Sequence, residues 1–259
     1  MFFFKGLSLI RVTGLLHPAK TSAMTQETSP QITLCIPVLN EEKTLPGLFS
    51  NLTSYFDKFM IPFEVIFCLD PSTDSSEKIL QEAHRKNSSF RYLLNPRRLG
   101  RAKSLLRALK EAQSSYIIAA SADLSIPLGD LMKLLQCLSE TSTSIAFGTR
   151  IDKKDSPFLS STSKKNRLEV TYMNIFWEQK RRRFKDPFSP AFVFKKEIRD
   201  LLLQDLKASA WYLTFSLQDQ VLEKNIPFAE IPVYASASQE KSFPYHREHL
   251  RLFWRSLSR

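Results

Sequence analysis

Four short segments in the first half of the chain carry residue types that can bind a nucleotide. They are, in order, IPVLNEE (36–42), EVIFCLDPSTDSS (64–76), NPRRLGRA (95–102) and SADLSIP (121–127). A carboxylate can accept a hydrogen bond from a nucleobase or hold a divalent cation, and arginines beside the N–H groups of a helix start can bind phosphate. These residue types therefore favour a site for a nucleotide.

Each segment follows a stretch with the pattern of a buried strand. Apolar runs predict strands at 31–38, 63–69, 90–94, 116–120 and 145–147, and helical spacing predicts helices at 42–57, 72–85, 99–112 and 128–138. Strands that alternate with helices form a mostly parallel sheet, in which ligands bind beyond the carboxyl ends of the strands. This α/β topology alone predicts a nucleotide site where the four segments meet.

Two of the segments contain side chains whose chemistry is specific. Asp70 closes the second predicted strand, where its carboxylate can accept a hydrogen bond from the imino N–H of a base. The alternative is a helix cap, a role that Ser72 or Asp74 fits better.

The third segment places arginines around a glycine at the start of a predicted helix. Arg97, Arg98 and Arg101 surround Gly100. The N–H groups at a helix N-terminus, with an adjacent glycine, favour phosphate.

Together the segments resemble the nucleotide-sugar half of a glycosyltransferase of family 2, which includes dolichol- and polyprenyl-phosphate sugar transferases. The resemblance continues through Gly148-Thr149-Arg150, DPFSPAFVFKKEI (186–198) and AEIPVYASASQEKSF (229–243), and covers residues 31–245. It implies a GT-A-type α/β fold, with a mostly parallel nucleotide-binding sheet flanked by helices and an acceptor-side C-terminal half. The implied reaction is inverting transfer of a sugar from a nucleoside-diphosphate sugar to a polyprenyl phosphate or another membrane-associated acceptor.

The resemblance also implies roles for individual residues. Asp123 and Arg150 would act in catalysis, Asp123 on a metal ion and the donor diphosphate, and Arg150 on the phosphate of the acceptor or donor. Asp70 would contact the base and Glu41 the ribose side. Nucleotide binding would involve Pro37, Asn40, Glu41, Asp70, Arg97, Gly100, Arg101, Ser121 and Ala122. Asn40 and Glu41 have a compatible alternative role as caps of the next helix.

The segment SADLSIP stands where related enzymes carry Asp-X-Asp, whose last acid binds Mg²⁺ or Mn²⁺. Here the first acid is replaced by Ser121 and the last is Asp123. Because Mg²⁺ is often held by one or two carboxylates plus substrate phosphates, we expect a weak metal site that forms only with the donor. The alternative is that arginine side chains replace the charge of the metal.

Other departures from the family pattern support a second hypothesis, a non-catalytic relative that binds a sugar nucleotide. The positions concerned are Leu69, Ser121, Pro190, Ser216 and Gln218. Measured transfer or hydrolysis of a sugar nucleotide would separate the two hypotheses.

The chain divides into four expected regions. We expect a flexible leader at 1–30, a nucleotide-sugar half at 31–150, an acceptor half at 151–245 and a basic amphipathic helix at 246–259. The boundary between the two halves would fall in the Ser- and Lys-rich loop 152–166.

The charge of the chain predicts an anionic partner. The net charge is +11, from 37 Lys and Arg against 26 Asp and Glu, with clusters at 97–101, 179–185 and 247–259. Aromatic and basic stripes in the predicted helices 166–183 and 246–258 suit an anionic membrane surface, and packing on the core is the alternative. Charge alone would also fit nucleic acid, a hypothesis ranked last because charge does not explain four ordered motifs.

The cysteines and hydropathy indicate the compartment. Cys35, Cys68 and Cys137 lack metal-type spacing and lie in apolar predicted elements, as core cysteines do in a reducing compartment. No run of 18 uncharged apolar residues occurs. We expect a cytoplasmic protein, peripheral on the inner face of a membrane.

Overall fold

The computed structural model describes residues 30–150, 184–186, 189, 191–204, 206 and 213–234. The expected leader up to residue 29, the loop 152–166, the two helices 166–183 and 246–259, and Pro190 lie outside these residues. The strands are β1 (Ile32–Val38), β2 (Phe63–Leu69), β3 (Phe90–Leu94), β4 (Tyr116–Ala119), β5 (Ile145–Arg150), β6 (Phe192–Lys195) and β7 (Phe228–Val233). The helices are α1 (Leu45–Phe59), α2 (Ser76–Lys86), α3 (Arg101–Glu111), α4 (Leu128–Glu140), the 3-10 helix η2 (Lys196–Ile198), α7 (Arg199–Leu203) and α8 (Leu213–Glu223).

The described strands form one sheet in the order β3-β2-β1-β4-β6-β5-β7. Strand β6 is antiparallel to both of its neighbours, and every other pair in this sheet is parallel. The expected mostly parallel α/β sheet of the GT-A type is therefore confirmed.

The register of the first three strands brings three of the motifs to one edge. Val38 lies opposite Leu69, and Leu69 lies opposite Leu94. The ladder continues one residue further, because the Asp70 N–H donates to the Val38 carbonyl at 3.0 Å and the Asn95 N–H to the Leu69 carbonyl at 2.9 Å. The loops after β1, β2 and β3 therefore begin side by side.

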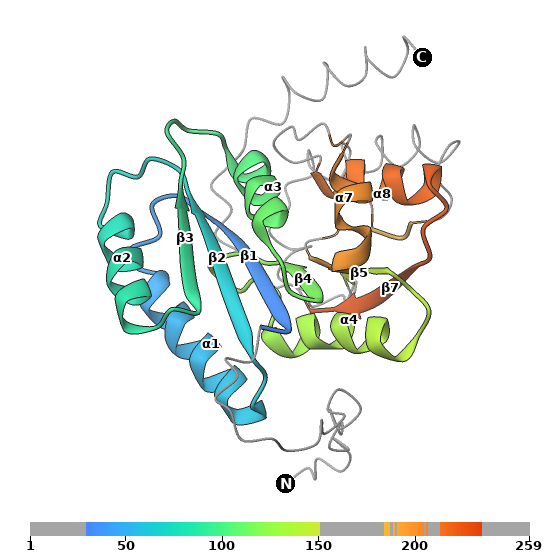
Figure 1. Cartoon of the computed structure of the whole chain (residues 1–259), viewed down its shortest axis with the longest axis horizontal. Helices are drawn as coiled ribbons and strands as arrows, with labels where there is room; N and C mark the ends of the chain where they lie inside the picture. Colours follow the sequence, from blue (N-terminus) through green and yellow to red (C-terminus); the bar gives the residue numbers. More distant parts are fainter. Residues whose placement is uncertain are drawn as a thin grey trace, which may run out of the picture.

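Helices cover both faces of this sheet (Figure 1). One face packs against α1, α2 and α4 through a core that contains Phe56, Phe67 and Leu134. The opposite face packs against α3, α7 and α8 through Phe147 and Leu217, among others. Alternation along the strands divides the side chains between the two cores, so Leu34 and Ile36 join the first and Cys35 the second.

Some element boundaries differ from the expected ones. Helix α1 begins at Leu45 rather than residue 42, because Glu41 first forms a turn whose carbonyl accepts from the N–H groups of Thr44 and Leu45. Strand β5 extends to Arg150 rather than 147, because its pairing with β7 continues to Arg150 opposite Val233. Within the described residues, no helix is both long and apolar enough to cross a membrane.

Candidate functional site

The loops after β1 and β2 are joined by hydrogen bonds between their polar residues. Asn40 has a left-handed backbone (φ 55°). Its N–H donates to Ser72 Oγ at 3.0 Å, and its Oδ1 accepts from the Thr73 N–H at 2.8 Å. The Glu41 N–H donates to Ser76 Oγ at 2.8 Å. Asn40 therefore links two loops and makes no cap bond to α1, so the capping alternative is wrong for its side chain.

The same two loops share a pair of carboxylates. Asp74 accepts from the backbone N–H groups of Glu42 and Ser76, each at 3.0 Å, and Glu42 accepts from the Ser75 N–H at 3.0 Å. Burial acts to raise the pKa of Asp74, but these hydrogen bonds outweigh it and lower the pKa. These hydrogen bonds join the loop after β1 to the loop after β2, beside the predicted ribose pocket.

Asp70 is buried at the end of β2, with 2% of its surface exposed. Its carboxylate accepts hydrogen bonds from the backbone N–H groups of Leu99 (3.1 Å) and Gly100 (2.8 Å), from Asn95 Nδ2 (2.8 Å) and from Ser104 Oγ (3.0 Å). Burial acts to raise the pKa of Asp70, and the four hydrogen bonds outweigh it and lower the pKa. Asp70 therefore fixes the loop between β3 and α3, and its contact with a base remains a prediction.

The arginines expected at the diphosphate lie on this fixed loop. Arg97, Arg98 and Arg101 are exposed, and Gly100 adopts a positive φ of 82° immediately before α3. The loop crosses the upper edge of the molecule in Figure 1, above the carboxyl ends of β2 and β3. Three exposed arginines thus lie on or directly after the loop that Asp70 holds, and their contact with phosphate remains a prediction.

The segment after β4 presents one carboxylate to solvent. Ser121 Oγ donates to Asp123 Oδ1 at 2.5 Å, and the Ser125 N–H donates to the same oxygen at 3.0 Å. Asp123 is exposed, whereas Ala122 beside it is buried. The hydroxyl of Ser121, which stands where the family has its first acid, therefore holds Asp123 in place.

The donor set at Asp123 is small for a metal ion. Among the described residues, no three His, Cys, Asp or Glu side chains gather in one place. An exposed carboxylate with a neighbouring hydroxyl offers the hard oxygen donors that Mg²⁺ and Mn²⁺ take, and phosphate oxygens of a ligand could complete the shell. The residues present fit a cation that is shared with a diphosphate.

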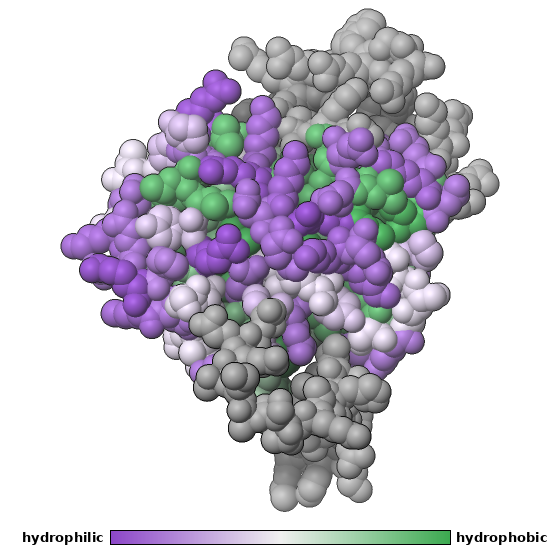
Figure 2. Space-filling model, in the orientation of Figure 1, coloured by the Kyte–Doolittle hydropathy of each residue, from purple (hydrophilic) through white to green (hydrophobic). Residues whose placement is uncertain are grey.

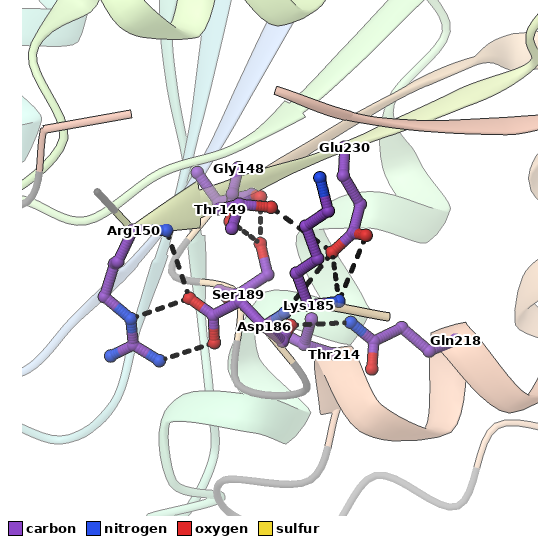
Figure 3. A network of polar contacts seen from close by, with 10 residues as sticks. Gly148, Thr149, Arg150, Lys185, Asp186, Ser189, Thr214, Gln218 and Glu230 are labelled. Atoms are coloured by element: carbon purple, nitrogen blue, oxygen red, sulfur yellow. Dashed lines mark hydrogen bonds and ion pairs between the residues drawn. The ribbon is translucent and has the colours of Figure 1, made fainter. Parts of the chain in front are cut away.

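Arg150, at the carboxyl end of β5, forms a two-pronged ion pair with Asp186 (Figure 3). Arg150 Nε donates to Oδ2 and Nη2 donates to Oδ1, each at 2.8 Å. The Asp186 side chain is almost fully buried, and that of Arg150 is one quarter exposed. Such parallel hydrogen bonds fix the plane of a guanidinium group.

The carboxylate of Glu230 holds the backbone next to this ion pair. Glu230 on β7 accepts from the Lys185 N–H at 2.8 Å, from the Asp186 N–H at 3.3 Å and from Thr149 Oγ1 at 3.2 Å. Gln218 on α8 donates its side-chain N–H to the Asp186 carbonyl at 3.0 Å. Figure 3 shows these residues converging from β5, β7 and α8.

Strand β6 brings the two clusters to the same part of the sheet. Phe192 lies opposite both Ala119 of β4 and Phe147 of β5, so the Asp123 and Arg150 segments follow strands on either side of it. Pro37 lies within β1 beside β2, opposite Cys68. All the residues predicted for the site lie in β1 or in segments that reach the carboxyl edge of the parallel strands.

Sequence reasoning missed Asp186 and Glu230 as site residues. Both stand in segments that the family resemblance had singled out, DPFSPAFVFKKEI and AEIPVYASASQEKSF. Their signal was an acid in an apolar segment, but the partners lie 36 and 81 residues away in the chain, at Arg150 and Thr149. No local pattern connects positions at such separations.

The model of one protein family matches this chain. Residues 33–201 match the model described as Glycosyl transferase family 2. The chain is 27% identical over 136 residues to the undecaprenyl-phosphate 4-deoxy-4-formamido-L-arabinose transferase of Serratia proteamaculans, and 29% identical over 135 residues to that of Aeromonas hydrophila. These stretches cover 52% and 51% of this chain, and 41% of each relative, so the match spans about two fifths of the relatives' length.

Solved structures share the fold at lower identity. The mannosyl-3-phosphoglycerate synthase of Rubrobacter xylanophilus superposes with a TM-score of 0.67 at 11% identity, over 88% of this chain and 74% of that one. A second structure is the glucosyl-3-phosphoglycerate synthase of Mycobacterium tuberculosis in complex with Mn²⁺, UDP and phosphoglyceric acid. It superposes with a TM-score of 0.61 at 15% identity, over 87% of this chain and 75% of that one. These likenesses support the architecture described above.

Proposed function

Since this chain belongs to glycosyl transferase family 2, we propose that it moves a sugar from a nucleoside-diphosphate sugar to a polyprenyl phosphate or another membrane-associated acceptor, with inversion. The observation that carries the proposal is that the four motif loops follow the carboxyl ends of neighbouring parallel strands, β3, β2, β1 and β4, with Asp123 exposed after β4. The undecaprenyl-phosphate transferases that resemble the chain support the lipid phosphate as acceptor class.

The donor would lie across the loops after β1 to β4. Asp70 and the loop it fixes would face the base, Glu41 would face the ribose, and Arg97, Gly100 and Arg101 would face the diphosphate. The loop geometry supports this arrangement, because the hydrogen bonds to Asp70 and Asp74 hold both sides of the pocket before a ligand arrives. A pocket that is already ordered loses less entropy on binding.

The acceptor phosphate would be bound by Arg150. Its guanidinium is oriented by Asp186, which supports a fixed position for the attacking phosphate oxygen. A phosphate acceptor is already anionic at neutral pH, so the reaction needs no strong general base. In a direct displacement, an oxygen of the acceptor phosphate would bond to the anomeric carbon while the bond from that carbon to the leaving nucleoside diphosphate breaks on the opposite side, which would invert the configuration.

Asp123 would hold Mg²⁺ or Mn²⁺ together with the donor diphosphate. When bound, such an ion neutralises negative charge on the leaving nucleoside diphosphate. The contribution of the chain is to keep the Asp123 carboxylate oriented, through Ser121 and the Ser125 N–H. The Mn²⁺ and UDP in a neighbour's structure support this choice of cofactor and donor class.

Titration with nucleoside diphosphates tests the donor site. With a single carboxylate, the metal and the nucleotide should each strengthen the binding of the other, by the same factor. We expect UDP or GDP to bind more tightly with Mn²⁺ than with a chelator, Asp123→Ala to abolish the difference, and Ser121→Asp to raise the affinity for Mn²⁺ alone. Equal nucleotide affinity with Mn²⁺ and with chelator would overturn the metal role.

A non-catalytic sugar-nucleotide-binding protein is the second candidate. The observation that favours it is the replacement of acids by Ser121 and by Gln218, whose side-chain Oε1 is buried without a hydrogen-bond partner among the described residues. Incubation with UDP-sugars and undecaprenyl phosphate in detergent separates the candidates. Nucleotide binding with neither transfer nor hydrolysis would favour the second.

A further inference from the structure

Helix α3 presents a row of cations to solvent. Its inner face is formed by buried Ala102, Leu105, Ala108 and Leu109. Lys103, Arg107 and Lys110 follow one another at spacings of four and three residues on the opposite side, where Lys103 and Lys110 are exposed. Figure 2 shows hydrophilic side chains over the part of the molecule where Figure 1 places α3.

No other described helix carries such an excess of positive charge. Residues 94–110 contain six Lys and Arg and no acid, and Glu111 follows as the first. On the other face of the sheet, α2 has two acids against three Lys and Arg, and α4 has two acids against one Lys. Within the described part of the chain, neither Lys103 nor Lys110 has an ion-pair partner.

The last residue of β3 is tied to α3 through its backbone, while alternation along the strand puts its side chain on the face of the sheet that carries Phe90 and Tyr92. Leu94, the last residue of β3, is 43% exposed. Its carbonyl accepts a hydrogen bond of 2.7 Å from Arg107 Nη1, which ties β3 to α3. Arg97 and Arg98 follow on the exposed loop at the carboxyl edge of the sheet.

From these observations we propose that the surface formed by Arg98, Lys103 and Lys110, here called the α3 basic surface, docks the protein on an anionic membrane. Exposed cations with no acid among residues 94–110 are attracted to the anionic headgroups of such a membrane. The inference rests on the proposed function, because a lipid-linked acceptor has to be reached at the membrane. Docking here would bring the edge with the predicted diphosphate loop to the lipid.

Sedimentation with vesicles tests the docking surface. We expect the full chain to bind phosphatidylcholine vesicles that contain phosphatidylserine at low salt, and to be released as salt screens the charges. The double variant Lys103→Gln/Lys110→Gln should bind about 30-fold more weakly, since each cation near an anionic surface contributes about 1 kcal/mol.

Helix α2 offers a matched control on the opposite face of the sheet. Lys78→Gln/Lys86→Gln removes the same charge from exposed positions in the first and last turns of that helix. This control should bind the vesicles within about twofold of the unmodified chain, because charges on a face turned away from the membrane are largely screened. Equal weakening by both double variants would overturn the proposal, because net charge would then suffice.

Two further measurements separate docking from the other hypotheses. Nucleotide affinity should be unchanged in Lys103→Gln/Lys110→Gln, since neither lysine belongs to the proposed donor site. Vesicle binding that depends on α3 in a protein without transferase activity would retain the docking surface and overturn the proposed function. Transfer to undecaprenyl phosphate by a protein whose vesicle binding does not depend on α3 would retain the proposed function and overturn the docking surface. Binding of single-stranded RNA in place of vesicles would overturn the docking proposal.

Discussion

At the scale of single residues, the candidate site is built around two carboxylates that bind the protein's own N–H groups, of which Asp70 is buried and Glu230 is partly exposed. Asp70 accepts from Leu99 and Gly100, and Glu230 accepts from Lys185 and Asp186. For Asp70, these hydrogen bonds outweigh the effect of burial and lower its pKa, so the charged form of this carboxylate orients the loop. Both carboxylates place an arginine-bearing segment at the edge of the sheet.

We expect Asp70→Asn to destabilise the protein and to weaken nucleotide binding. The amide offers one acceptor oxygen in place of two and places N–H groups near the N–H donors of Leu99 and Gly100. The free energy of unfolding should therefore fall by roughly 1–3 kcal/mol at neutral pH. Urea unfolding and calorimetry with a nucleoside diphosphate measure the two effects. The exposed Asp57→Asn serves as control and should change stability by less than about 0.5 kcal/mol.

The stability difference between the unmodified chain and the Asp70→Asn variant should depend on pH in one direction. Because the folded-state pKa of Asp70 is lowered, its contribution is present above the unfolded value of about 3.9 and is lost as pH falls through the folded pKa. The urea midpoints of the two proteins should therefore converge in acid. A difference that stays constant down to the acid transition would contradict this assignment.

We expect Asp186→Asn to weaken the binding of the acceptor more than the binding of the donor. Without the carboxylate, Arg150 loses its two-pronged partner and its fixed plane, so the Michaelis constant for the lipid phosphate should rise about tenfold while donor affinity stays the same. Initial rates at varied undecaprenyl phosphate and varied donor give the two constants. Asp200→Asn breaks the exposed pair of Arg199 with Asp200 and is the matched control, with no change expected.

At the scale of elements, the loops depend on a few backbone conformations. Gly100 has a φ of 82° directly before α3, where its N–H reaches Asp70. A side chain at this φ is strained even though open space surrounds the position where its Cβ would lie. The junction of loop and helix therefore depends on glycine at this position.

We expect Gly100→Ala to cost about 1–2 kcal/mol of stability and to loosen the loop that carries Arg97. Gly129→Ala is the control, since Gly129 lies in the first turn of α4 with nothing near its Cβ position. There alanine should stabilise the helix by about 0.5–1 kcal/mol. Thermal unfolding of both variants gives the comparison, and a gain of stability in Gly100→Ala would refute the strain argument.

At the scale of the whole molecule, one sheet joins the two cores. Phe67 belongs to the core under α1, α2 and α4, and Phe147 to the core under α3, α7 and α8. Strand β6 connects β4 to β5, so the strands of the predicted donor half and those after it share one hydrogen-bonded ladder. The two halves expected from the sequence therefore share a sheet in the described residues.

We expect the described domain to unfold as one unit. Phe67→Ala and Phe147→Ala should each lower the free energy of unfolding by about 3–5 kcal/mol and shift the midpoint of a single unfolding transition. Circular dichroism and aromatic absorbance should follow the same transition. Each substitution removes an aromatic ring from one of the two cores, but the shared sheet couples the unfolding of the two cores. Two separated transitions in either variant would show that the halves fold independently.

Local patterns in the sequence determined the elements of the first 150 residues and the edge of the sheet at which the candidate site is expected. Apolar runs and helical spacing act within a few residues, so they place strands such as 63–69 correctly, and alternation with helices sets the parallel topology. Tertiary structure decided the partners: Asp70 binds N–H groups about 30 residues away, and Arg150 binds an acid 36 residues away. Such pairs are set by which chain segments meet when both cores close, and spacing in one sequence carries no signal for them.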